Sequence, residues 1–155
     1  WIHAAHLFFE GEKMSKRKGN IKYPQDLLET DCIWNHIRFF FIYGHYRQKL
    51  DFAFKKYNCI CELLKSFRLL VKKLESNTNN EIKSSIKVKK LVAQLSTDFE
   101  EHMNNDLHVK EAFNSLYKNV ESLVALKETH KLSNEDSREA IKKLKSIDYV
   151  LQTLF

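Results

Sequence analysis

The run KMSKRKGN, from Lys13 to Asn20, has the residue types needed to bind a polyphosphate. Four of its first six residues are basic, and their mutual repulsion keeps them out of a core and favours an anionic partner. Two residues separate Lys13 from Lys16, so both lysines can reach one polyphosphate from a loop, and Gly19 lets the backbone turn after them. Lysine suits this task because its compact, mobile charge can follow a phosphate group. A solvated basic turn or a general nucleic-acid patch is the alternative interpretation.

Segments on both sides of the basic run carry a family resemblance together with it. They are Trp1-Ile2-His3, His6-Leu7, Glu10-Gly11-Glu12 and Ile37-Arg38-Phe39-Phe40. This pattern resembles the KMSKS region of class I aminoacyl-tRNA synthetases and the stretch that opens their α-helical domain. The segment GHYRQKLDF, residues 44–52, is similar to the HYRxPLDF segment of the cysteinyl-tRNA synthetase branch. Residues 103–107 (MNNDL) and 112–116 (AFNSL) are similar to two later segments of the same family.

The resemblance implies a role for each residue of the basic run. Lys16 is the first candidate for the catalytic lysine that stabilises charge on the departing pyrophosphate, and Lys13 is the second. The ATP-binding residues would be Lys13, Met14, Ser15 and Lys16. Gly19 and Asn20 would set the loop geometry and permit closure. The candidates for residues near tRNA are Arg17, Lys18, Arg38, His45 and Arg47.

Several positions depart from the family pattern. Arg17 stands where serine is usual, which removes a hydroxyl group and adds a permanent charge. Lys49 stands where proline is common, and Asn104 and Asn105 replace acidic residues. We expect Arg17 to alter the detailed geometry of the loop but not its role. No contact with tRNA is transferred from the family to Asn104 and Asn105.

Other parts of the implied enzyme are absent from the sequence. It has no HIGH-type signature, no Gly-rich nucleotide fold and no strand–helix alternation typical of a parallel sheet. In the resembling family the cysteine pocket, its zinc and the first ATP signature precede the residue that matches Trp1. We therefore expect this chain to be part of a cysteine–tRNA ligase and to be inactive alone. The expected partners of the parent are tRNA(Cys), ATP with Mg, and cysteine through the upstream part, with zinc ligands outside this chain.

Two other functions stay open. Related ligases attach cysteine to an amino-sugar instead of tRNA and use the same loop. Alternatively, the chain is a non-catalytic, basic helical module that binds RNA or a protein partner. A HIGH signature encoded upstream in the gene would separate both enzymatic interpretations from the third.

The composition limits the fold and the setting of the protein. The 155 residues are 43% hydrophobic, enough for one core or for one core with a small appendage, and only three Gly and one Pro favour long helices. The net charge of +6 suits an anionic partner. An odd number of cysteines, three, argues against a disulfide framework and for a reducing compartment. We expect a cytoplasmic monomer. No apolar run of the sequence is long enough to span a membrane.

Hydrophobic spacing predicts the elements that must position the basic run. Residues 6–12 are expected to form a short hairpin around Glu10-Gly11. Apolar residues then recur at helical spacing, and the expected helices cover residues 25–29 after Pro24, 32–43 capped by Asp31, 54–75, 82–104, 108–128, and a last helix capped by Ser133. The helix over 82–104 is expected to bury Val88, Leu91, Leu95, Phe99 and Met103, and the last helix is expected to extend to Leu154. Residues 76–80, which are polar, are expected to form a loop. Short connections place such helices antiparallel. The prediction is a mainly α chain: residues 1–30 as the tail of a class I catalytic domain, and residues 31–155 as a helix bundle.

Four further features are interpreted as structure. The pair His3 and His6 has no third ligand nearby, so no metal site is predicted. Cys59 and Cys61 would lie on opposite faces of one helix. The run Phe39-Phe40-Phe41 is expected in the core. Arg38 must find a partner or reach solvent, because an unpaired buried guanidinium is too costly.

Overall fold

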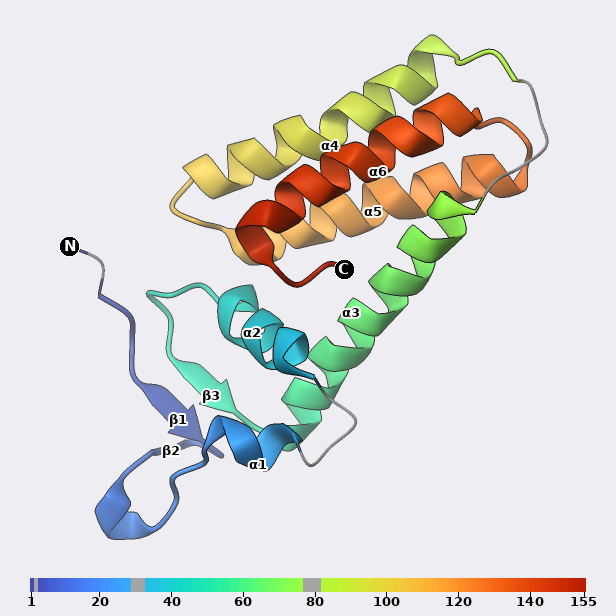
Figure 1. Cartoon of the computed structure of the whole chain (residues 1–155). Coiled ribbons are helices and arrows are strands. Elements are labelled where there is room, and N and C mark those ends of the chain that lie inside the picture. The colour runs from blue at the N-terminus through green and yellow to red at the C-terminus, as the bar shows by residue number, and fades with distance from the viewer. Residues whose placement is uncertain (2, 29–32, 77–81) are drawn as a thin grey trace. The chain divides into compact units, whose positions relative to one another are not determined.

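The computed structural model describes residues 1, 3–28, 33–76 and 82–155 (Figure 1). Within these residues the chain is mainly α-helical, with one small sheet near its N-terminus. Contacts between residues divide it into two compact units, Trp1–Leu64 and Lys65–Phe155. We call them unit 1 and unit 2 and describe each by itself. Helix α3 (Phe54–Glu75) begins in unit 1 and ends in unit 2.

The sheet of unit 1 has three short strands, β1 (Leu7–Phe9), β2 (Glu12–Lys13) and β3 (Leu50–Phe52), in the order β2-β1-β3. Strands β1 and β2 form the predicted antiparallel hairpin. Its two turn residues have positive φ angles, 50° at Glu10 and 82° at Gly11. This is the backbone geometry of a two-residue type I′ turn, whose twist matches that of the flanking strands. The sequence therefore located the hairpin correctly.

Strand β3 pairs with β1 in parallel, with Phe8 opposite Asp51. No strand was predicted at these residues. Three residues are too few for alternation to be recognised, and the pairing joins segments about 40 residues apart.

Two helices follow the basic run. Helix α1 (Pro24–Leu28) begins at the predicted proline, and the Asp26 carboxylate accepts a hydrogen bond of 2.9 Å from the backbone N–H of Tyr23. Helix α2 (Trp34–Tyr43) begins two residues later than predicted, and the N–H of the residue before it, Ile33, donates to Nδ1 of His36. The predicted cap, Asp31, lies outside the described residues. Gly44 ends α2, as predicted.

Aromatic side chains form the core of unit 1. Phe39, Phe40, Phe52 and Tyr57 are buried, and the ring of Phe40 lies 5.3 Å from that of Phe52 and 5.4 Å from that of Tyr57. The prediction that all of Phe39-Phe40-Phe41 is core was wrong for Phe41, which is 39% exposed. Three consecutive helical residues spread over more than half of the helix circumference, so one of them faces away from the core.

Unit 2 is an antiparallel helix bundle, which confirms the predicted fold class. It contains the C-terminal part of α3 with α4 (Ile86–Asn104), α5 (Val109–Glu128) and α6 (Asn134–Leu151). In Figure 1, α4, α5 and α6 lie side by side, with α5 antiparallel to the other two. Its core contains predicted core residues of α3, α5 and α6, among them Phe67, Leu74, Phe113, Leu116, Ala140 and Leu144. Leu154, predicted on the last helix, is buried beyond its end.

Helix α4 differs from the prediction in two ways. It starts at Ile86 instead of near Ile82, because the Ser85 side chain caps it by accepting from the backbone N–H of Val88. Its buried stripe contains Val92, whereas the predicted Leu91 and Met103 are only half-buried. Successive helical residues differ by 100° around the helix axis. Leu91, one residue before the buried Val92, therefore lies at the edge of the core instead of inside it.

The described helices include none that is long and apolar enough to cross a membrane. The predicted loop at 76–80 lies outside the described residues except for Ser76. The division into residues 1–30, as the tail of a catalytic domain, and residues 31–155, as a helix bundle, stays a prediction.

Candidate functional site

The basic run forms a loop that is closed from inside by one side chain. The amide group of Asn20 accepts a hydrogen bond of 2.8 Å from the backbone N–H of Ser15. The same amide donates to the backbone carbonyl of Lys13 at 3.3 Å. Asn20 thus joins the last residue of the loop to its first and third residues. We refer to residues Lys13–Asn20 as the KMSK loop.

The middle of the KMSK loop is a single 3₁₀ turn, Lys16–Lys18. The backbone N–H of Lys18 donates to the carbonyl of Ser15, and that of Gly19 donates to the carbonyl of Lys16. Gly19 ends the turn with a φ of 67°, in the left-handed region that glycine adopts without strain. A tight turn followed by glycine projects the three basic side chains outward.

The four cations of the KMSK loop have different surroundings. The Lys18 ammonium lies 3.1 Å from the Glu12 carboxylate, with both side chains well exposed. The Lys13 ammonium lies 3.5 Å from Nε2 of His6. The side chains of Lys16 and Arg17 are exposed and form no hydrogen bond or ion pair with the described residues. They are therefore the two loop cations whose charge is not already shared with a neighbour in the described structure.

Met14 and Ser15 are half-buried, between the exposed cations on either side. They face inward while Lys13 and Lys16 reach solvent. This arrangement agrees with two lysines reaching one ligand from the same loop. It gives Met14 and Ser15 a part in holding the loop in place.

Strand β3 and the segment before it hold β1 along its length. The backbone N–H of Ala5 donates to the Tyr46 carbonyl, and that of Glu10 donates to the Phe52 carbonyl, both at 3.0 Å. The Asp51 carboxylate accepts from the N–H of Gly11 at 3.0 and 3.1 Å. Sequence reasoning did not select Asp51, although it lies in the matched segment 44–52. Its contact joins residues 40 positions apart, which no local pattern reports.

The candidates for residues near tRNA lie on three elements of unit 1. Arg17 and Lys18 are in the KMSK loop, and Arg38 is on the exposed side of α2. His45 and Arg47 lie on either side of Tyr46 in the sequence. The His45 and Tyr46 rings stack with their centroids 4.9 Å apart, and the Arg47 guanidinium lies 5.2 Å from the centroid of the Tyr46 ring. Arg38 was expected to find a partner or reach solvent, because it lies in an apolar helix; its side chain is exposed.

No group of three or more His, Cys, Asp or Glu side chains in the described part of the chain is placed to hold a metal ion. Cys59 is exposed and Cys61 is buried, as predicted for residues two apart on a helix. His6 instead faces Lys13.

Unit 2 has polar groups of its own, and the buried ones belong to its packing. The Lys127 ammonium is buried and donates to the carbonyls of Leu74 and Ser76, at the end of α3. Burial lowers the pKa of Lys127 below its usual value of 10.5. The Asp98 carboxylate of α4 accepts from the side chains of Ser115 and Asn119 of α5.

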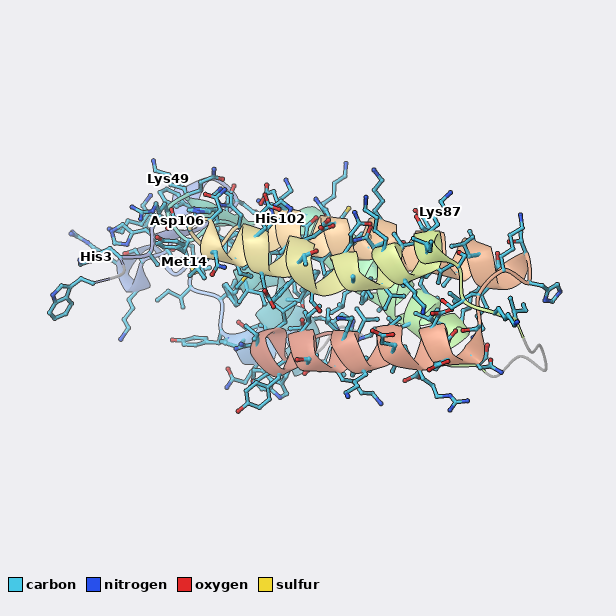
Figure 2. The ribbon with its side chains drawn as sticks, turned by 90° about the horizontal axis from the view of Figure 1, so that it is seen from above. His3, Met14, Lys49, Lys87, His102 and Asp106 are labelled. Atoms are coloured by element: carbon cyan, nitrogen blue, oxygen red, sulfur yellow. The ribbon has the colours of Figure 1, made fainter. Side chains whose placement is uncertain are left out.

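On its surface, unit 2 has an open groove of about 620 Å³ between α4 and α5. Lys87 and Lys90 line it on the α4 side, and Ser122 and Thr129 line it on the α5 side. Figure 2 shows Lys87 near the start of α4 and His102 near its end. Leu91, Ala125 and Leu126 also line the groove, and the hydroxyl groups of Ser122 and Thr129 donate to backbone carbonyls of α5. The two lysines are therefore the lining groups suited to a phosphate backbone.

The sequence is similar to known proteins over almost its whole length. Residues 1–62 match the family described as the catalytic domain of class I (C) tRNA synthetases. A cysteine–tRNA ligase of Leptospira interrogans is 29% identical over 99% of the chain, and one of Chlamydia pneumoniae is also 29% identical over 99%. One of Brachyspira hyodysenteriae is 31% identical over 79%.

The chain spans only about a quarter to a third of the length of these relatives: 33%, 32% and 26%. The family match covers the KMSK loop, the sheet and α2, and the relatives extend the similarity through the helix bundle. These matches together support the resemblance to cysteinyl-tRNA synthetases: residues 1–62 match a catalytic-domain family of class I (C) tRNA synthetases, and almost the whole chain is similar to one segment of cysteine–tRNA ligases.

Proposed function

We propose that the full-length product of this gene is a cysteine–tRNA ligase, in which the KMSK loop stabilises ATP and pyrophosphate while cysteinyl-adenylate forms. The similarity to cysteine–tRNA ligases over 99% of the chain supports the reaction. The observation that carries the role of the loop is the exposure of Lys16, without a partner among the described residues, on a loop closed by Asn20.

In this reaction the cysteine carboxylate attacks the α-phosphate of ATP, and the bond from that phosphorus to the bridging oxygen of pyrophosphate breaks. Negative charge grows on the departing pyrophosphate. A lysine that meets this charge more closely in the transition state than in bound ATP accelerates the step. Lys16 is the first candidate, because its ammonium is not shared with a described neighbour.

Lys13 is the second candidate. Its ammonium lies near His6 at the base of the loop, so it would bind phosphate with less freedom than Lys16. Arg17 adds a third cation that can reach the same anion. The Lys18 ammonium is paired with the Glu12 carboxylate, whose negative charge weakens its attraction for phosphate.

The residues present fit a polyphosphate but not a resident metal. The exposed cations of the KMSK loop suit phosphate oxygens. The described residues offer no cluster of metal ligands. As the family resemblance implies, Mg would be bound with ATP, and zinc would be held by residues of the parent enzyme outside this chain.

For the second step, we propose that the helical unit binds tRNA(Cys). The net charge of +6 and the lysine-lined groove between α4 and α5 support an RNA partner. The similarity to tRNA ligases extends through unit 2, which favours tRNA over an amino-sugar as the acceptor of cysteine. It also favours an enzyme over a separate RNA-binding module.

The test is to supply the full-length gene product with ATP, Mg and radiolabelled cysteine, and to measure ATP–pyrophosphate exchange and transfer to acceptors. We expect exchange that depends on cysteine, and transfer to tRNA(Cys) but not to an amino-sugar. Exchange with transfer only to the amino-sugar would show that the acceptor of cysteine is the amino-sugar and not tRNA. Absence of exchange, with RNA binding retained, would favour the non-catalytic module.

A further inference from the structure

The turn that leads into the KMSK loop is held by a carboxylate from a distant part of the chain. Both oxygens of Asp51 lie at hydrogen-bond distance from the backbone N–H of Gly11, at 3.0 and 3.1 Å. Asp51 is half-buried on β3, 40 residues after Gly11. A charged acceptor forms a stronger hydrogen bond than a neutral one. This contact is therefore more than a routine turn interaction.

The turn lies at the short edge of the sheet. Strand β2 is only two residues long and pairs with β1 alone, so few ladder hydrogen bonds form on the β2 side of the turn. Glu10 adopts a φ of 50°, which costs energy for a residue with a side chain. The N–H of Glu10 donates to the Phe52 carbonyl, next to the bond from Gly11 to Asp51. Two consecutive residues of β3 thus hold both N–H groups of the turn.

The KMSK loop starts two residues after this turn. Because Asn20 bonds to both Ser15 and Lys13, the loop is an internally connected segment. The position of such a segment is set at its base. A change in the Gly11 turn would move the whole loop, and Lys16 with it.

We propose that Asp51 is a positioning residue for the KMSK loop, holding the Gly11 turn so that Lys16 is aimed at the developing charge on pyrophosphate. This inference rests on the proposed function of the loop. Asp51 itself contacts the backbone of Gly11 and takes no part in the chemistry. The simpler alternative is that Asp51 only stabilises unit 1.

The experiment compares variants of the full-length protein in cysteine-dependent ATP–pyrophosphate exchange. Asp51→Ala removes the acceptor, whereas Asp51→Asn keeps an oxygen that can still accept from Gly11. Asp26→Ala is the matched control: it removes a carboxylate that also accepts from a backbone N–H, but at the start of α1. A double-variant cycle combines Asp51→Ala with Lys16→Ala.

We expect Asp51→Ala to lower kcat about tenfold, or about 1.4 kcal/mol in activation free energy, with the KM for cysteine unchanged. Asp51→Asn should recover part of the loss, and Asp26→Ala should keep the parental rate. In the Lys16→Ala background, Asp51→Ala should cause no further loss, because the lysine that it positions is gone. Hydrogen exchange of the Gly11 amide in the 155-residue chain should accelerate in Asp51→Ala.

Equal losses in Asp51→Ala and Asp26→Ala, or a loss that is fully additive with Lys16→Ala, would overturn the inference in favour of general stabilisation. A parental rate in Asp51→Ala would overturn it as well. If Asp51→Ala does not fold, as judged by circular dichroism, Asp51→Asn takes its place in the cycle. The single variant Lys16→Ala separates the two claims: a parental rate there refutes the proposed role of the loop, whereas a slow rate there with a parental rate in Asp51→Ala refutes only the role of Asp51.

Discussion

At the scale of single residues, Asn20 determines the shape of the KMSK loop. Its side chain uses both its acceptor and its donor within the loop, on the Ser15 N–H and the Lys13 carbonyl. The sequence motif pointed to Asn20 for loop geometry, and these bonds give a physical reason for that role. The role in catalysis stays a prediction.

Asn20→Ala should slow adenylate formation by the full-length protein about tenfold, because loss of two hydrogen bonds, each contributing about 1 kcal/mol, releases Lys16 from a fixed position. Asn20→Asp serves as the comparison, since its carboxylate can accept from Ser15 but cannot donate to Lys13, and its rate should be intermediate. Single-turnover rates of adenylate formation provide the measurement. Equal rates for Asn20→Ala and the parent would show that the loop needs no internal closure.

At the scale of elements, the buried ammonium of Lys127 on α5 contacts the C-terminus of α3. The Lys127 ammonium donates to two carbonyls that have no later helical turn to pair with. The neighbouring ion pair of Lys73 with Glu128, 3.0 Å long, is exposed and contributes little. Lys127 is therefore the stronger tie between α3 and α5.

Lys127→Met should lower the free energy of unfolding of the 155-residue chain by about 1–3 kcal/mol, the cost of leaving buried carbonyls without donors. Chemical denaturation followed by circular dichroism measures it. Lys118→Met, on the exposed side of α5, is the matched control and should change stability by less than about 0.5 kcal/mol. Equal effects of the two substitutions would mean that the buried ammonium is not a structural tie.

The same residue predicts a pH dependence. Burial places the pKa of Lys127 in the folded chain below 10.5, the usual value, which applies to the unfolded chain. At pH values between the folded pKa and 10.5, the unfolded chain therefore binds more protons than the folded chain. Stability contributed by this ionisation therefore rises with pH through that window, and is lost as pH falls through the folded pKa. The difference in unfolding free energy between the parent and Lys127→Met should widen as pH increases towards 10.5. A difference that narrows would contradict the direction of the shift.

The elements show which structural information a sequence carries locally. Helix α3 was predicted with the bounds that the structure has, because 22 residues repeat their apolar pattern over many turns. Strand β3 and the contact of Asp51 with Gly11 were missed, because both depend on segments about 40 residues apart. Within the site, the motif selected Lys16 and Asn20 directly, whereas nothing local distinguished Asp51 from other surface carboxylates.

At the scale of the whole molecule, the two units divide the proposed work. Unit 1 contains the KMSK loop, and unit 2 offers a helical surface with a lysine-lined groove. A net charge of +6 supports an anionic partner for the chain as a whole.

The 155-residue chain should bind tRNA weakly, with an affinity that falls steeply with salt, since released counterions would supply most of the binding free energy. Fluorescence anisotropy at several salt concentrations tests this. Lys87→Ala with Lys90→Ala should reduce the salt slope by roughly one for each phosphate that is no longer neutralised, while Lys118→Ala serves as the control. Tight binding that is indifferent to salt would contradict a mainly electrostatic interaction.

The central claim is that Lys16 acts on charge that develops only as pyrophosphate leaves. Its most direct test is the pre-steady-state rate of cysteine-dependent adenylate formation by the full-length protein carrying Lys16→Ala, beside Lys56→Ala as an exposed lysine of α3 in the same unit. The account predicts a rate about a hundredfold lower for Lys16→Ala, or about 3 kcal/mol, with cysteine binding nearly unchanged and Lys56→Ala at the parental rate. A Lys16→Ala protein that activates cysteine at the parental rate would contradict it and leave Lys16 as a solvated loop cation.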